Sequence, residues 1–145
     1  MAKLHYKPTK VYYLKLHEAA NAQNQPETNT SFTRLNTPIK PKTYLDYYNK
    51  VGQNYNWNNR NNIDHLTLNT LINAEHTSIF IYNIANTPMG FVELIKTTNY
   101  TEILYFGLFP KAIGKGQGTL FLQQVIALAW QNNPKWVQLL SLIHI

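Results

Sequence analysis

Three glycines at every second position are the residues of this chain best suited to hold a ligand. Gly114, Gly116 and Gly118 separate an apolar stretch, residues 101–109, from a periodic apolar stretch that begins at Thr119. Glycine lets the backbone take tight, partly left-handed turns and bring its amides close to a bound group. The first turn of a helix also has unpartnered N–H groups and a partial positive charge. The spacing therefore predicts an anion site and a ligand that carries phosphate.

Two common phosphate motifs do not fit these residues. A Walker loop places a lysine directly before its Ser or Thr, and no lysine directly precedes Thr119. A dinucleotide fingerprint needs Gly-x-Gly-x-x-Gly and an acidic residue about 20 positions later, and both are absent. The simpler alternative is a flexible turn, with Lys111 and Lys115 as ordinary solvated charges.

The glycines lie between a strand and a helix. Residues 101–109 are rich in β-formers and almost continuously apolar, which is typical of a strand covered on both faces. Residues 119–130 repeat apolar side chains at helical spacing. Further strands are expected at residues 11–17, 31–36, 78–84, 89–97 and 135–140. The predicted fold class is α/β (α+β), a mixed, mostly antiparallel sheet flanked by helices, with a ligand between the ends of its last, parallel pair.

Two more helices are expected before the central strands. Thr43 and Asp46 have the spacing of a capping box, which opens a helix that Gly52 ends. Asp64 is a good N-cap for a second helix over residues 64–73.

Composition excludes several classes of site. The chain of 145 residues is predicted to be a single domain, 1–145, with flexible segments at 1–10 and 19–30. It has no cysteine, and its five histidines lack metal-site spacing, so neither disulfides nor a metal is expected. It has no long apolar run and no apolar leader, so the expected location is cytoplasmic, with no membrane partner.

The net charge of +6 fits a polyanionic cofactor. Because the basic residues are not clustered with aromatic ones, a nucleic-acid partner is not expected.

Residues 113–119, Ile-Gly-Lys-Gly-Gln-Gly-Thr, resemble the Arg/Gln-x-x-Gly-x-Gly/Ala element of the GNAT superfamily of N-acetyltransferases, although its first position is Ile113 here. The resemblance covers residues 11–138 and is strongest from Ile79 onward. It implies a GNAT-like acyl-CoA N-acyltransferase fold with acetyl-CoA as cosubstrate and no metal. The cofactor-binding residues that it implies are Phe106, Gly107 and Leu108 beside the pantetheine arm, and Ile113, Gly114, Lys115, Gly116, Gln117, Gly118 and Thr119 at the pyrophosphate.

Acetyl transfer to an amine also needs a base and an acceptor groove. The resemblance makes Glu102 the expected base, with Glu93 as an alternative base or as the carboxylate that orients a cationic amine. Both glutamates could instead be structural residues of the sheet. Tyr55 and Trp57 are expected to line the groove for a small-molecule or peptide amine, with core packing as the alternative for Trp57. Whether the chain forms a homodimer is left open.

The family's domain normally continues past the strand at residues 135–140, with another helix and two strands. The resemblance therefore implies an incomplete domain that lacks these C-terminal elements and leaves residues 136–139 on an uncovered sheet edge. The expected activity is N-acetylation of a primary amine. The alternative is a non-catalytic CoA-binding or protein-interaction module.

Overall fold

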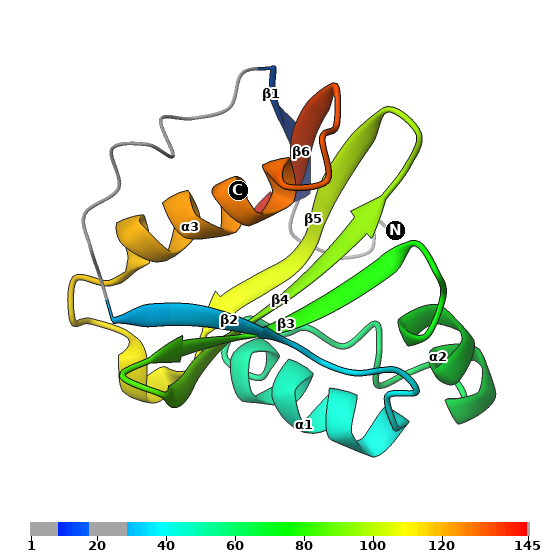
Figure 1. Cartoon of the computed structure of the whole chain (residues 1–145). Helices are drawn as coiled ribbons and strands as arrows, with labels where there is room; N and C mark the ends of the chain where they lie inside the picture. The colour runs from blue at the N-terminus through cyan, green and yellow to red at the C-terminus, as the bar shows by residue number, and fades with distance from the viewer. Residues whose placement is uncertain (1–8, 18–28, 145) are drawn as a thin grey trace.

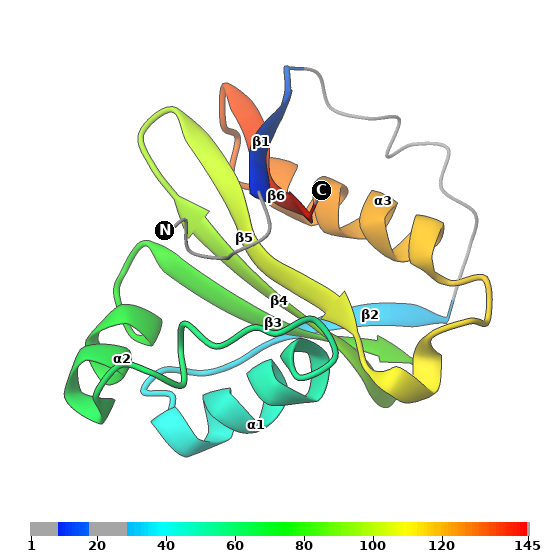
Figure 2. The same cartoon turned by 180° about the vertical axis from the view of Figure 1, so that it is seen from behind.

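The computed structural model describes residues 9–17 and 29–144. Its elements are β1 (Thr9–Leu16), β2 (Thr30–Arg34), α1 (Pro41–Gly52), α2 (His65–Ile72), β3 (Thr77–Ile84), β4 (Thr87–Lys96), β5 (Tyr100–Leu108), a 3-10 turn (Pro110–Ala112), α3 (Gly118–Trp130) and β6 (Trp136–His144). The six strands form one sheet in the order β1-β6-β5-β4-β3-β2. Helices α1 and α2 cover one face of this sheet and α3 covers the other (Figures 1 and 2).

The strand pairing confirms the predicted mixed, mostly antiparallel sheet. Strands β2 to β5 pair antiparallel in sequence order, and α3 then crosses to β6, which lies parallel to β5. The expectation of an uncovered edge at residues 136–139 is wrong, because β1 pairs antiparallel with β6 from Thr9 opposite His144 to Leu16 opposite Val137. The N-terminal strand thus protects the strand that follows the crossover helix.

The two early helices differ in how well their starts were predicted. Helix α1 begins at Pro41 rather than after Thr43, and its N-cap residue Lys40 makes no side-chain cap. Proline suits a first helical position because the N–H that it lacks would have no helical partner there. The start of α2 is confirmed, because the Asp64 carboxylate accepts a hydrogen bond from the Thr67 amide at 2.7 Å.

The segments predicted to be flexible, 1–10 and 19–30, lie outside the described residues except at their inner ends. At those ends Thr9 and Lys10 open β1 and Thr30 opens β2, and the flexibility of the two segments stays a prediction. These residues pair with strands that lie far away in the sequence.

Apolar side chains form a separate cluster on each face of the sheet. On the α1 face, Tyr44 and Tyr48 pack against Phe91 of β4. On the α3 face, Val125 packs with Ile103 of β5. Because strand side chains alternate between faces, the central strands are apolar on both sides, as residues 101–109 predict.

Candidate active site

Strands β5 and β6 separate partway along their length. Their parallel pairing runs from Tyr100 opposite Trp136 to Ile103 opposite Leu139. Beyond that point β6 continues beside β1 to His144, whereas residues 105–108 of β5 pair with β4 alone. The sheet therefore forks after Ile103, and the fork leaves one edge of β5 without a strand partner.

The open edge of β5 presents main-chain groups to the fork. The Phe109 amide donates to the Met89 carbonyl at 2.8 Å, so Phe109 directs its N–H toward β4. Main-chain groups alternate in direction along an antiparallel strand, so those of Gly107 also point toward β4. Those of Phe106 and Leu108 point into the fork. Of the three predicted strand residues, these two face the open edge.

A different contact explains the glycine at position 107. A Cβ atom on Gly107 would lie 2.2 Å from Cγ1 of Val51. The last turn of α1 therefore packs directly onto the backbone of β5, and glycine is the residue that allows this close approach.

The glycine loop lies between the end of β5 and the start of α3. Gly114 and Gly116 have positive φ angles of 81° and 73°, and a Cβ on either would meet no atom within 4 Å. The Ile113 amide donates to the Pro110 carbonyl at 3.1 Å and is therefore already partnered. Within the described part of the chain, the amides of residues 114–120 have no hydrogen-bond acceptor, and the first backbone bond into α3 is donated by Phe121.

The charges around this loop are positive. Lys111 and Lys115 are exposed, and residues 109–120 contain no carboxylate. Lys50, near the end of α1, has its Nζ 5.1 Å from the ring centroid of Phe109. Bare amides, a helix N-terminus and nearby lysines all favour an anion, so these residues fit a diphosphate.

Glu102 lies at the fork, one residue before Ile103. Its Oε1 accepts a hydrogen bond from Nε2 of Gln138 at 2.7 Å, and Oε1 of Gln138 accepts one from Nε1 of Trp136 at 2.9 Å. Among the described residues, the second oxygen of Glu102 has no hydrogen-bond partner. No local sequence pattern predicts these two hydrogen bonds, because they depend on the register of β5 and β6, whose residues Glu102 and Gln138 are 36 positions apart.

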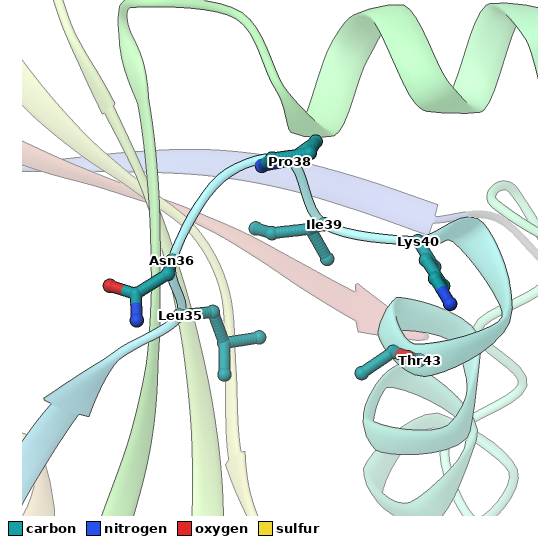
Figure 3. A pocket seen from close by; sticks show the side chains of 6 residues that line it. All are labelled: Leu35, Asn36, Pro38, Ile39, Lys40 and Thr43. Carbon is teal, nitrogen blue, oxygen red and sulfur yellow. The ribbon is translucent and has the colours of Figure 1, made fainter.

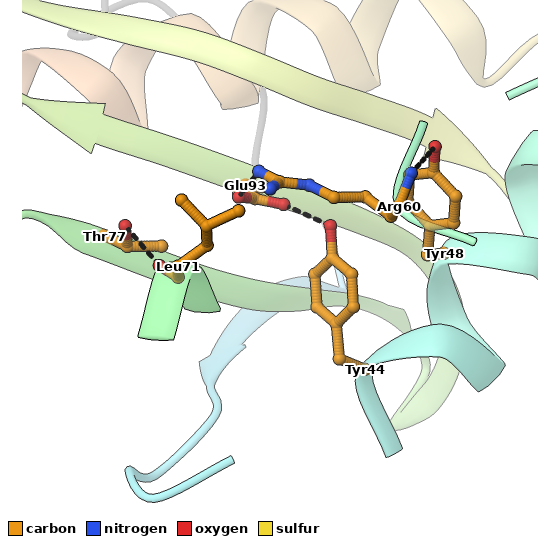
Figure 4. Close-up of polar contacts among 6 residues, drawn as sticks. All are labelled: Tyr44, Tyr48, Arg60, Leu71, Thr77 and Glu93. Carbon is orange, nitrogen blue, oxygen red and sulfur yellow. Dashed lines mark hydrogen bonds and ion pairs between the residues drawn. The ribbon is translucent and has the colours of Figure 1, made fainter. Parts of the chain in front are cut away.

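Glu93 is held in a different way. Its side chain is 0% exposed. The Tyr44 hydroxyl donates a hydrogen bond to Oε1 at 2.5 Å, and Nη2 of Arg60 donates one to Oε2 at 2.8 Å (Figure 4). Burial raises the pKa of Glu93, while the Arg60 guanidinium and the Tyr44 hydroxyl act against that rise. Both carboxylate oxygens thus have protein partners, an arrangement that ties the loop carrying Arg60 to the centre of the sheet.

The other two members of this cluster are also perturbed by burial. Burial and the neighbouring Glu93 carboxylate both raise the pKa of the Tyr44 hydroxyl. Burial lowers the pKa of Arg60, but the Glu93 carboxylate and nearby tyrosines outweigh it, so that this pKa is raised. Arg60 therefore stays charged in a site where its side chain is only 11% exposed.

The two predicted groove residues lie on the loop between α1 and α2. Trp57 is half-buried, with its ring 5.5 Å from that of Tyr48 and 5.0 Å from that of Tyr105. Tyr55 is 55% exposed and lies 6.4 Å from Trp57. Trp57 thus packs against the core and Tyr55 lies at the surface. Tyr105 adds an aromatic side chain from β5, which no sequence motif had indicated.

A surface pocket of about 320 Å³ lies elsewhere, between β2 and the start of α1 (Figure 3). None of the predicted site residues lines it; its walls are Leu35, Asn36, Pro38, Ile39, Lys40 and Thr43. It is at the opposite end of α1 from the contact with β5. In the described residues no cluster of three metal-binding side chains occurs, and none of their helices has the length and apolarity to cross a membrane.

Comparison with protein-family models and with curated protein sequences finds no match. Among solved structures, the chain is similar to a GNAT family acetyltransferase of Staphylococcus aureus (TM-score 0.58, 19% identity, covering 78% of this chain and 87% of that one). It is also similar to the aminoglycoside acetyltransferase meta-AAC0020 from an uncultured soil metagenomic sample, in complex with sisomicin (TM-score 0.59, 14% identity, 78% of each chain).

A third similar structure is a GNAT family acetyltransferase from Elizabethkingia anophelis with acetyl-CoA bound (TM-score 0.53, 18% identity, 78% of this chain and 65% of that one). The chain spans only 50% of the length of a functionally unknown conserved protein from Staphylococcus epidermidis that it also resembles. At these identities the comparisons establish the fold. The chain has the fold of the GNAT family acetyltransferases, as its glycine motif predicted.

Proposed function

We propose that this protein is an N-acetyltransferase that moves an acetyl group from acetyl-CoA to a primary amine. The proposal rests on one observation: the open edge of β5 is followed by a loop whose amides at residues 114–119 have no hydrogen-bond partner among the described residues. An acyl-CoA needs both features, because its pantetheine arm carries amide groups and its diphosphate is an anion. The acetyl-CoA bound to the Elizabethkingia anophelis enzyme gives further support, since that enzyme has the same fold.

In the proposed complex the amides of the glycine loop and the start of α3 bind the diphosphate. The main-chain groups of Phe106 and Leu108 bind the pantetheine arm and direct the thioester toward the fork beside Glu102. Glu102 then takes a proton from the acceptor amine, the amine nitrogen attacks the thioester carbonyl, and the carbon–sulfur bond breaks. CoA leaves as the thiol. Main-chain N–H groups of the β5 edge stabilise the oxyanion that develops on the carbonyl oxygen.

Calorimetric titration with CoA tests the binding half of this proposal. Gly116→Glu places a carboxylate in the loop and is expected to abolish binding by repelling the diphosphate. Thr98→Glu is the matched control, because it adds the same charge at an exposed turn between β4 and β5. Equal CoA affinity in the two variants would contradict the proposal.

Turnover tests the catalytic half. Glu102→Gln keeps the hydrogen bond from Gln138 but cannot take a proton, so kcat at neutral pH is expected to fall by roughly 10²–10⁴-fold with unchanged CoA affinity. An unchanged kcat would remove Glu102 as the base. CoA binding without any product from a panel of amines would instead identify a non-catalytic CoA-binding module.

A further inference from the structure

A row of polar side chains crosses the sheet at the fork. Lys15 of β1 lies opposite Gln138 of β6, and Gln138 lies opposite Glu102 of β5. Residues opposite one another in a sheet share a face, and strands lie about 4.8 Å apart. Lys15 is therefore two strands from Glu102, on the same face, and a lysine side chain can span much of that distance.

An ammonium group already lies on this face. The Nζ atom of Lys15 is 5.4 Å from the ring centroid of Trp136, which is the distance of a cation–π contact. The ring of Tyr100 stacks on Trp136 at 5.2 Å with an interplanar angle of 23°. Trp136 thus presents an aromatic surface that stacks on Tyr100, lies 6.2 Å from the His17 ring and is linked to Glu102 through the Gln138 side chain. The Lys15 ammonium shows that a primary alkylammonium group fits on the Trp136 ring.

Trp136 also fixes the orientation of the carboxylate. An indole N–H can only donate, so its bond to Oε1 of Gln138 directs the Gln138 amide NH₂ toward Glu102. This bond occupies one oxygen of Glu102. The second oxygen is left for a proton from an amine on the neighbouring aromatic surface.

Resting on the proposed function, we propose that the acceptor's ammonium group binds over Trp136 beside Glu102, in the place that the Lys15 ammonium occupies. The acceptor is then a single primary amine on a linear alkyl stem, such as a lysine side chain. Glu102 takes one proton from the ammonium, the neutral nitrogen forms the new bond to the thioester carbon, and CoA leaves with a proton as the carbon–sulfur bond breaks. Lys15 competes with the acceptor and must move away before the acceptor binds.

The KM for butylamine tests this competition. Lys15→Met removes the competing ammonium and is expected to lower KM about threefold to fivefold, the equivalent of one exposed cation–π contact, with kcat unchanged. Lys96→Met is the matched control: it removes the same charge from an exposed residue of β4 that alternation places on the α3 face. An unchanged KM in Lys15→Met, or an equal fall in both variants, would overturn the inference.

Two substitutions of Trp136 separate binding from positioning. Trp136→Leu removes both the ring and the N–H donor, so it is expected to raise KM for butylamine about threefold to fivefold and also to lower kcat. Trp136→Phe keeps an aromatic ring but loses the donor to Gln138, so it should mainly lower kcat. Unaltered kinetics in both would overturn the inference.

Acceptor choice gives an independent readout. Sisomicin carries several amines, which the Lys15 ammonium would repel, and in the proposed acceptor site only the Glu102 carboxylate could bind one of them. We therefore expect a lower kcat/KM for sisomicin than for butylamine. A higher value for sisomicin would refute the inference and leave the proposed function intact. Absence of CoA binding and of all transfer would instead refute both.

Discussion

Replacing Arg60 by methionine removes the charged partner of a fully buried carboxylate. Among the described residues, Arg60 is the only cation bonded to Glu93, with its Nη2 atom 2.8 Å from Oε2. In the variant the Tyr44 hydroxyl would remain as the other hydrogen-bond donor to Glu93. Breaking a buried ion pair from one side costs about 3–5 kcal/mol, because the remaining charge is uncompensated. The guanidinium also lies 5.4 Å from the ring centroid of Tyr105, a contact that methionine only partly replaces.

Urea unfolding followed by tryptophan fluorescence measures this loss at a pH above the raised pKa of Glu93, where its carboxylate is charged. With an m-value of about 2 kcal/mol/M, the expected destabilisation lowers the midpoint by about 2 M. Adding Glu93→Gln to Arg60→Met removes the buried charge and keeps an oxygen for Tyr44, so the double variant should be more stable than Arg60→Met alone. A loss below about 0.5 kcal/mol for Arg60→Met, typical of a surface change, would refute this reasoning. So would a double variant that is less stable than Arg60→Met.

Two further outcomes are expected. Gly107→Ala should destabilise the fold by about 1–3 kcal/mol, because the added Cβ overpacks against Val51. Thermal unfolding should show that adding Val51→Ala recovers part of this loss. The affinity for CoA should not change, because the main chain of Gly107 points toward β4. Burial raises the pKa of Glu93 above its ordinary 4.5, so at pH values between 4.5 and the raised pKa the native state keeps a proton that the unfolded chain has lost. The stability of the parent relative to Glu93→Gln should therefore be largest below pH 4.5 and decline as pH rises through the raised pKa, which unfolding at a series of pH values would measure.

The strand, glycine loop and helix at residues 100–130 could be predicted because each has a local pattern. Continuous β-formers, alternate glycines and helical spacing all act within a few residues of one another. The start of α1 was missed because the Thr43 and Asp46 spacing is a weaker constraint than Pro41 at the first helical position.

The contacts of the candidate site depend on pairings that no local pattern encodes. The Gln138–Glu102 bond requires the β5–β6 register, and the place of β1 beside β6 joins opposite ends of the chain. The same holds for Arg60, a loop residue whose partner Glu93 lies 33 positions away in a buried strand. A single sequence could suggest these residue types as candidates but could not pair them.

Amide hydrogen exchange with and without acetyl-CoA shows whether the unpartnered amides of residues 114–119 bind a diphosphate while the open edge of β5 binds the pantetheine arm. Acetyl-CoA is expected to slow exchange at residues 114–119 and at Phe106 and Leu108, and to leave Gly107 unchanged because its amide already points toward β4. Protection confined to the pocket between β2 and α1, or no protection at any of these amides, would rule out this mode of acetyl-CoA binding.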